Sequence, residues 1–496
     1  MTMTREDWSA RAAKLQPEGR AFIDGAYRHA LSGKTFANIN PATGQAICEV
    51  AECDVADVDL AVASARKAFD SGIWSRMAPA DRKRILLRFS ELMASHSEEL
   101  ALLETLDVGK PITNSFTGDL PSAIGCIQWY AEAIDKLYGE VAPTPHDFTA
   151  IVVREPIGVV AAVVPWNYPL SMAAWKLGPA LAAGNSVILK PAEQSPLTAV
   201  RIAQLGMEAG LPPGVLNVVT GYGETAGRAL GLHMDVDAVG FTGSTAVGKL
   251  FMKYSGESNI KRIGLECGGK SPHIVLADCD DLDGAARAVA AGIFSNAGQV
   301  CNAGSRLIVE EPIRAQLLER VVAIARDLRP GDPLDPATRL GAIVSQQQLS
   351  SVMGYVKTGR DEGARLLVGG GRAREESGGY FIEPAVFDGV GSGMRIAQEE
   401  IFGPVLATIS VRSLDEALKV ANDTIYGLAA GIWTRDIRSA QKAAKALRAG
   451  VVWINCFDKG NMSAPFGGFK QSGSGRDKSM HAFDKYMDWK AVWTAA

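Results

Sequence analysis

The 496-residue sequence has no long run of lysine or arginine, and its 51 basic residues are balanced by 55 acidic ones for a formal net charge of −4. This absence argues against nucleic acid as a partner, which would call for a concentrated basic patch. Hydrophobic residues make up 47% of the chain and charged residues 21%, which is typical of globular proteins and excludes wholesale disorder. At about 150 residues per domain, the length predicts two or three domains.

Paired cysteines and metal-ligand spacings are also missing. The chain has seven cysteines, an odd number, without a CxxC motif, and its six histidines show neither HxxxH nor HExxH spacing. We therefore expect no disulfide framework and no metal site, and a reducing cytoplasm as the location.

A leader and a membrane span are likewise not expected. The first 15 residues include Glu6 and Asp7 and have no apolar core, which argues against a signal peptide. Residues 156–175 carry no charge and are long enough to cross a bilayer. However, Pro165 and Pro169 would break such a helix in its middle, so a buried strand, a turn and a helix start are predicted instead.

What the sequence does have is a repeated alternation of short apolar runs and helical segments. Between residues 150 and 270 the apolar runs are 159–164, 186–189, 215–219, 238–241 and 261–265. This order is typical of βαβ units, with a parallel sheet covered by helices on both faces. Ligands bind such sheets at the carboxyl ends of the strands, so the residues that follow each run are candidates for a site.

The remaining segments predict further elements. Residues 53–135 have apolar positions at helical spacing, and residues 270–455 alternate strand and helix again, which predicts a second α/β domain. Residues 137–156 predict a hairpin that projects from the first domain. Residues 490–495 predict a late edge strand, and edge strands of this kind often pair with another chain, which points to an oligomer.

Two residues are candidates for acyl chemistry. Cys301 lies in GQVCNAG, where small neighbours leave a thiol reachable for nucleophilic attack. From the local sequence alone, a buried structural cysteine is the commoner role of this residue type. Glu266 ends an apolar run before two glycines and could take a proton from water, although a solvated strand-end glutamate is the simpler alternative.

Other polar residues at strand ends suit an oxyanion or a cofactor. Asn167 could donate its amide to an oxyanion or merely cap the next helix. Ser244, in the turn FTGSTAVG, could bind a phosphate or act as an ordinary N-cap. Glu193 lies 28 residues after Pro165, about where a dinucleotide fold places an acidic group for ribose hydroxyls, with Lys190 beside it.

Taken together, these motifs resemble the NAD(P)-dependent aldehyde dehydrogenases over roughly residues 20–490. The matching segments are PWNYP, VILKPAEQSPLTA, FTGSTAVGK, LECGGKSPHIV, GQVCNAGSR, EEIFGPV and NCFDKGNMSAPFGGFKQSGSGRDKS. The closing RDKSMHAFDKY is similar to bacterial γ-glutamyl-γ-aminobutyraldehyde and guanidinobutyraldehyde dehydrogenases. The resemblance implies an α/β fold with a Rossmann-type NAD domain at 1–133 and 157–268, a catalytic domain at 269–470, and a small bridging β-sheet for oligomerisation at 134–156 and 471–496.

The resemblance also implies residue roles. Cys301 is then the nucleophile, Glu266 the general base, and Asn167 a donor of the oxyanion hole together with the backbone N–H of Cys301. The implied contacts of NAD, with NADP as an alternative, are Trp166, Lys190, Glu193, Gly223, Gly243, Ser244, Gln348, Glu400 and Phe402. The substrate tunnel is implied to be lined by Tyr168, Trp175, Phe457 and Phe466, with Asp458 near its mouth. Cys267 stands where leucine is usual, so packing next to the base is expected to differ.

The implied reaction begins when the Cys301 thiolate adds to the aldehyde carbon. The adduct gives up a hydride to the nicotinamide, and water activated by Glu266 hydrolyses the resulting thioester to the acid. An ω-amino or ω-guanidino aldehyde is the expected substrate, because aromatic faces and a carboxylate both suit a cationic tail.

Other functions are alternatives to this one. They are an aromatic substrate such as indole acetaldehyde, a broad aliphatic specificity, transfer of the acyl group to coenzyme A, and a non-enzymatic structural role. The presence of Glu266 argues against acyl transfer to coenzyme A, and the presence of Cys301 argues against a purely structural role. A homo-oligomer is expected, either a dimer or a tetramer.

Overall fold

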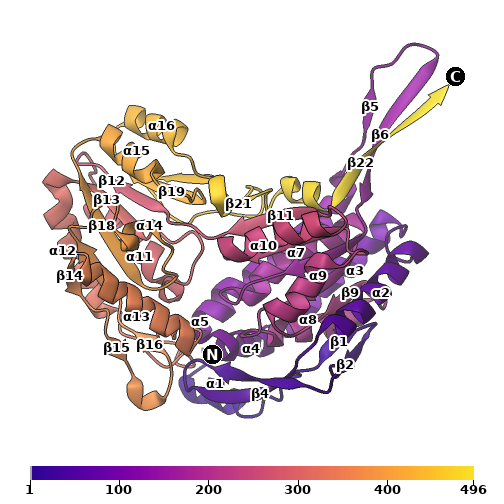
Figure 1. Cartoon of the computed structure of the whole chain (residues 1–496), viewed down its shortest axis with the longest axis horizontal. Helices are drawn as coiled ribbons and strands as arrows, with labels where there is room; N and C mark the ends of the chain where they lie inside the picture. The colour runs from indigo at the N-terminus through magenta and orange to yellow at the C-terminus, as the bar shows by residue number, and fades with distance from the viewer. Residues whose placement is uncertain (1–2, 496) are drawn as a thin grey trace.

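The computed structural model describes residues 3–495, and its larger sheet has eight strands in the order β2-β1-β9-β8-β7-β10-β11-β21 (Figure 1). Their bounds are, in that order, Ala26–Arg28, Ala21–Ile23, Leu216–Val218, Ser186–Lys190, Val159–Val163, Ala238–Gly243, Arg262–Cys267 and Gly473–Ser474. The strands from β9 to β11 are parallel, which confirms the βαβ pattern predicted from the apolar runs.

Helices cover both faces of this sheet. They are α2 (Val55–Ser71), α3 (Pro79–Ser95), α4 (Ser97–Val108), α6 (Leu120–Ala133), α7 (Pro169–Ala183), α8 (Leu197–Ala209), α9 (Arg228–Leu232) and α10 (Thr245–Glu257). Alternate residues of β7 point to opposite faces: Val160 and Ala162 pack with α3, α6, α7 and α8, whereas Val159 and Ala161 pack with α2 and α10. The predicted helical stretch 53–135 is confirmed.

A second sheet of seven strands has the order β14-β17-β18-β13-β12-β19-β20. The bounds are Arg365–Val368, Ala385–Asp388, Val405–Val411, Arg306–Glu310, Pro272–Val275, Ala429–Trp433 and Val451–Ile454. The helices of this part are α11 (Leu282–Phe294), α12 (Glu311–Asp327), α13 (Gln346–Asp361), α14 (Arg395–Gln398), α15 (Leu414–Asn422) and α16 (Ile437–Ala446). All strands except β14 are parallel to their neighbours, so the predicted second α/β unit is confirmed.

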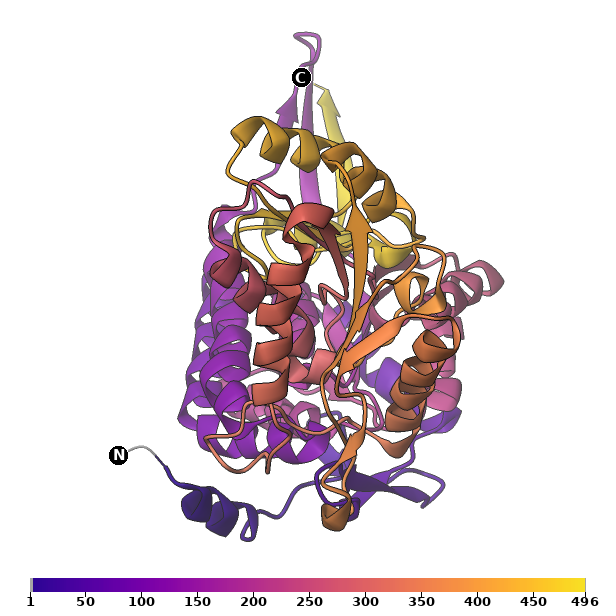
Figure 2. The same cartoon turned by 90° about the vertical axis from the view of Figure 1, so that its left-hand side faces the viewer.

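A third sheet projects from the first as a narrow arm (Figure 1). It consists of β5 (Glu140–Ala142), β6 (Phe148–Pro156) and β22 (Met487–Ala495), and β6 is the central strand. The predicted hairpin and late strand are thus both confirmed. Figure 2 shows that the chain ends on this arm, far from the N-terminal helix α1 (Arg5–Ala12).

The remaining small elements are α5 (Ile112–Asn114), the hairpin of β3 (Thr35–Asn40) with β4 (Gln45–Ala51), and the pair of β15 (Arg372–Ala373) with β16 (Phe381–Ile382). None of the helices in residues 3–495 is long and apolar enough to cross a membrane. The uncharged stretch 156–175 instead forms the end of β6, all of β7, a turn and the first half of α7, as its two prolines predict.

One segment departs from the expected division of the chain. Gly473 and Ser474 fall in the predicted bridging segment 471–496, yet they form β21 at the edge of the eight-stranded sheet, antiparallel to β11. Gly473 has φ 129°, and a Cβ there would lie 2.2 Å from the carbonyl oxygen of Leu265. Only glycine allows this approach, and it brings the C-terminal segment against the strand that carries Glu266.

Candidate active site

Glu266 lies at the end of β11, in the position predicted for it. Its side chain is buried, and neither carboxylate oxygen has a hydrogen-bond partner among the described residues. Burial raises its pKa to about 7, and the nearby ammonium of Lys176 opposes the shift. A carboxyl group with this proton affinity can exchange a proton with water near neutral pH.

Cys301 follows a tight turn that joins α11 to β13. Asn296 and Ala297 in this turn adopt left-handed backbone angles, with φ of 48° and 53°. A Cβ on Gly298, the next residue, would lie 2.1 Å from the carbonyl oxygen of Gly403. The turn is therefore pressed against the EEIFGPV loop, and strained backbone of this kind is characteristic of functional sites.

The thiol and the carboxylate face each other. Burial raises the pKa of the half-buried Cys301, and the negative charge of Glu266 raises it further. The structure thus brings together the two residues that the sequence predicted for nucleophile and base, one on β11 and one on a loop 35 residues further along the chain.

Asn167 connects this pair to the first sheet. It lies buried in the turn between β7 and α7, and its Nδ2 donates to the backbone oxygen of Gln299 at 3.0 Å. Asn296 in turn donates to the backbone oxygen of Asn167 at 3.0 Å. A side-chain amide has two N–H donors, so one remains for the oxygen of a bound substrate.

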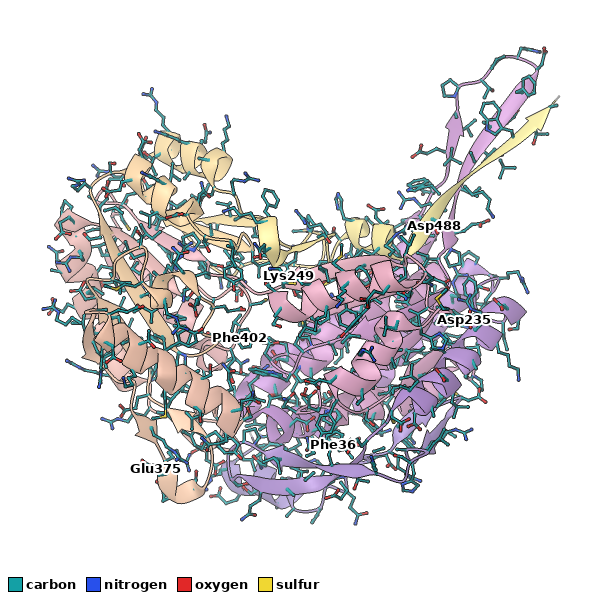
Figure 3. All side chains as sticks on the ribbon, in the orientation of Figure 1. Phe36, Asp235, Lys249, Glu375, Phe402 and Asp488 are labelled. Atoms are coloured by element: carbon teal, nitrogen blue, oxygen red, sulfur yellow. The ribbon has the colours of Figure 1, made fainter. Side chains whose placement is uncertain are left out.

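The EEIFGPV loop supplies a second acidic group. Glu400 accepts a hydrogen bond from the backbone N–H of Gly269 at 3.2 Å, and burial raises its pKa to about 7. Phe402 has a left-handed φ of 54° and packs edge-on against Trp166 with ring centroids 5.1 Å apart. In Figure 3 its label lies between the two large sheets. Gln348 donates to the backbone oxygens of Ile401 and Phe402, so its amide supports the loop.

The predicted adenosine side lies along the ends of β8 and β10. Lys190 is buried at the end of β8, with its Nζ 3.7 Å from Glu193, and burial lowers its pKa. Gly243 ends β10, and the exposed Ser244 caps α10 by accepting from the N–H of Val247 at 3.3 Å. A Cβ added to Gly223 would have no other atom within 4 Å, so there is open space next to this residue.

This arrangement fits a dinucleotide. The strand order reverses at β7, because β8 and β9 continue on one side and β10 and β11 on the other. In open parallel sheets, ligands bind where the order reverses, at the carboxyl ends. Trp166 and Ser244 follow the two strands that flank this point, and an exposed helix N-terminus with open space near Gly223 suits phosphate groups.

Three of the predicted tunnel residues lie close to the catalytic pair or to one another. The ring of Tyr168 lies under the ammonium of Lys110 at 3.8 Å, and burial raises the pKa of its hydroxyl, with smaller contributions from Asp119, Asp458 and Cys301. Trp175 and Phe466 meet edge to face at 5.3 Å. Asp458, exposed on the loop after β20, accepts from the Nδ2 of Asn302 at 2.8 Å, next to Cys301.

Phe457 is not part of this group. Its ring stacks on His273 at 4.6 Å and packs against Trp453 in a separate core of the second sheet. Asp458, the next residue, turns outward with a left-handed φ of 54°. The prediction that Phe457 lines the tunnel differs from this placement, because the ring is buried against His273 and Trp453.

Comparisons with known proteins agree with this geometry. The model of the aldehyde dehydrogenase family matches residues 27–492. The chain belongs to this family. Aminoacetaldehyde dehydrogenase of Pseudomonas aeruginosa is 52% identical over 495 residues, covering 100% of this chain and 99% of that protein.

Two solved structures are similarly near. An indole-3-acetaldehyde dehydrogenase in complex with NAD+ is 58% identical with a TM-score of 0.99, and 100% of each chain is covered. The γ-glutamyl-γ-aminobutyraldehyde dehydrogenase of Burkholderia cenocepacia is 55% identical with a TM-score of 0.98, covering 99% of this chain and 100% of that one. The predicted α/β fold, the dehydrogenase activity on aldehydes and the NAD cofactor are thereby confirmed.

Sequence reasoning missed a buried ionic group beside the base of this aldehyde dehydrogenase. Asp477 pairs with the ammonium groups of Lys176 and Lys485, and all three side chains are buried. A lysine in the middle of the otherwise apolar helix α7 was the one available signal, because such a residue is almost never buried unless paired. Cys267, whose role the sequence left open, is a buried residue whose Sγ lies close to Gly248 of α10.

Proposed function

We propose that Cys301 and Glu266 carry the aldehyde oxidation of this chain. The observation that supports the roles most directly is a buried carboxylate without a hydrogen-bond partner that faces a reachable thiol. Buried polar groups are normally satisfied, so a buried carboxylate without a hydrogen-bond partner calls for a partner that arrives with the reaction.

The chain's own groups then act in order. Cys301 adds to the carbonyl carbon as a thiolate, and the amide of Asn167 and the backbone N–H of Cys301 hold the resulting oxyanion. A nicotinamide held by Trp166, Glu400 and Phe402 would supply the acceptor for the hydride that leaves this carbon. Glu266 takes a proton from water, the water oxygen attacks the thioester carbon, and the Cys301 thiolate leaves as the acid forms.

The cofactor contacts are part of the same proposal. Lys190 and Glu193 bind the adenosine ribose, while Ser244, Gly243 and Gly223 leave room for phosphates. Trp166, Glu400 and Phe402 position the nicotinamide half, and Gln348 acts by holding their loop. Glu193 favours NAD over NADP, because a carboxylate accepts from ribose hydroxyls and repels a 2′-phosphate.

The substrate is an ω-amino or ω-guanidino aldehyde. Asp458 presents a carboxylate near Cys301, and Tyr168, Trp175 and Phe466 supply aromatic rings. The relatives named for aminoacetaldehyde and for γ-glutamyl-γ-aminobutyraldehyde support this choice. An aromatic aldehyde is the second candidate, favoured by the Trp175–Phe466 pair and by the relative named for indole-3-acetaldehyde.

An aldehyde panel tests this proposal. NADH formation is measured with ammonium-, guanidinium- and methyl-ended aldehydes of equal length and with indole acetaldehyde, each with NAD and with NADP. We expect higher kcat/KM for the cationic tails, and Asp458→Asn to cost about 1–3 kcal/mol on them and little on the methyl-ended aldehyde. Equal losses on both would make Asp458 a structural residue, and a clear wild-type preference for indole acetaldehyde would favour the second candidate.

The proposal also includes the location of the enzyme and its oligomeric state. The enzyme works in the cytoplasm as a homo-oligomer, a dimer or a tetramer, and the projecting sheet of β5, β6 and β22 supplies the contact. Val141, Trp489 and Trp493 are exposed on this sheet, and its outer strands leave backbone groups free to pair.

A further inference from the structure

The aromatic pair of the site already faces a cation that belongs to the chain itself. The ammonium of Lys478 lies 4.5 Å from the ring centroid of Trp175 and 5.5 Å from that of Phe466. These are distances at which a cation is attracted to a ring face. The two rings are thus held together by Lys478 as well as by their own edge-to-face contact.

Lys478 has charged neighbours but no direct partner. Burial lowers the pKa of Lys478, and the nearby carboxylates of Asp458 and Asp477 oppose this shift. Within residues 3–495 its ammonium takes part in no ion pair or hydrogen bond. An ammonium carries three N–H donors, so a partly buried one without an oxygen acceptor offers unused donors to whatever molecule enters.

The backbone beneath Lys478 is firmly held. Asp477 exchanges backbone hydrogen bonds with Phe466 at 2.7 and 2.8 Å, and its side chain is fixed by Lys176 and Lys485. On the other side, the N–H of Ser479 donates to the backbone oxygen of Met462 at 2.8 Å. Lys478 has a φ of 58°, a conformation that persists where the surrounding structure enforces it.

We propose that Lys478 determines which tails the substrate site accepts. It favours aldehydes whose tail carries an oxygen acceptor, a carboxylate or an acyl oxygen, and weakens the preference for tails that end in a bare ammonium. This rests on the proposed function, because it places the aldehyde at Cys301 and the tail among Trp175, Phe466 and Asp458.

The charges of Asp458 and Lys478 determine which substrate tails are favoured. A bare ammonium gains attraction from Asp458 and meets repulsion from Lys478, so the two contributions oppose each other. A tail that combines an amino group with a carboxylate satisfies both residues, and its oxygen takes the N–H donors that Lys478 leaves unused. Lys478 therefore adds a preference for an oxygen acceptor to the preference for cationic tails.

Three aldehydes of equal length test this role: one ending in a carboxylate, one in an ammonium and one in a methyl group. Ratios of kcat/KM within each variant remove any general loss of activity. In Lys478→Met we expect the carboxylate-to-methyl ratio to fall at least tenfold and the ammonium-to-methyl ratio to rise, both mainly through KM. Lys478→Arg keeps the charge and should keep both ratios near those of the wild type.

Lys459→Met is the matched control, because Lys459 is exposed on the loop that carries Asp458. It should leave both ratios as in the wild type. Unchanged ratios in a folded Lys478→Met protein overturn the role of Lys478, and Lys478→Gln provides the same comparison if the methionine variant does not fold. Absence of NADH formation with every aldehyde in the wild type would instead overturn the proposed function.

Discussion

Two buried carboxylates beside the same strand behave in opposite ways. Asp477 accepts from the ammonium groups of Lys176 and Lys485, and these cations hold its pKa below the ordinary value. Glu266, on β11, has no hydrogen-bond partner for either oxygen, and burial raises its pKa to about 7. Both side chains are equally buried. Partners, and not burial, therefore decide which carboxylate stays charged and which can exchange a proton.

The difference in partners distinguishes a carboxylate that stabilises the fold from one that can take part in the reaction. A fully paired buried ion group holds its segment in place, and removal of one member leaves the others uncompensated. An unpaired buried carboxylate lowers the stability of the fold. We expect such a group where water or substrate provides its hydrogen-bond partner during the reaction. The paired group also lies near enough to influence Glu266, since Lys176 and Lys485 lower the pKa of Glu266 and Asp477 raises it.

The largest expected effect is the loss of activity when the thiol of Cys301, next to the unpaired Glu266, is removed. Cys301→Ala removes the nucleophile, so we expect a loss in kcat of at least about 10³-fold. NAD binding, measured by calorimetry, should persist because the cofactor residues lie on other elements. Cys456→Ala is the control, since Cys456 is also half-buried, and it should remain active. Substantial turnover in a folded Cys301→Ala protein would contradict the mechanism.

For the paired carboxylate Asp477, we expect the main effect of a substitution to be on the stability of the fold. Asp477→Asn leaves the Lys176 and Lys485 ammonium groups buried without a counter-charge, which should cost about 3–5 kcal/mol in the free energy of unfolding. Asp135 is the matched control because it also pairs with two lysines, but on the surface. Asp135→Asn should change the unfolding midpoint far less. Equal changes in both variants would remove the distinction drawn between the buried cluster and surface pairs.

Glu266→Gln should separate the two halves of the reaction. The thioester forms without a water activator, so we expect a burst of NADH followed by turnover about 10²–10³-fold slower than in the wild type. In the wild type, hydrolysis should fall as pH drops through about 7, since the base acts in its ionised form. Stopped-flow absorbance and intact mass follow both steps. Without a burst or a thioester adduct, Glu266 would have to act before hydride transfer.

Much of this arrangement could be predicted from sequence because it depends on local pattern. The apolar runs located β7, β8, β9, β10 and β11, and the residues after them do lie at the carboxyl edge of a parallel sheet. The resemblance placed Glu266, Cys301 and Asn167 in one site, and the structure brings them together. Boundaries also followed local chemistry, as at Pro169, which begins α7.

What the sequence could not predict depends on contacts between distant segments. The position of Lys478 depends on Trp175 and Phe466, and pairing of Asp477 depends on a lysine in α7 that is 301 residues away. No spacing rule connects such segments. The resemblance implies that Phe457 lines the tunnel, whereas its ring packs on His273 and Trp453, which are distant in the sequence.

The smallest expected effect is a gain in stability when the unpaired Glu266 is replaced by glutamine. The folded-state pKa of Glu266 is about 7 against 4.5 ordinarily, so the folded protein holds this proton more tightly and loses that stabilisation as pH rises through 7. At pH 8 the buried charge persists, whereas Glu266→Gln removes it and should stabilise the fold by about 1–3 kcal/mol. At pH 5 the gain should be under about 1 kcal/mol. Denaturant unfolding at both pH values measures the difference, with Glu376→Gln as an exposed control. If the gain does not depend on pH, Glu266 is not charged and unpaired in the folded enzyme, and the contrast with Asp477 fails.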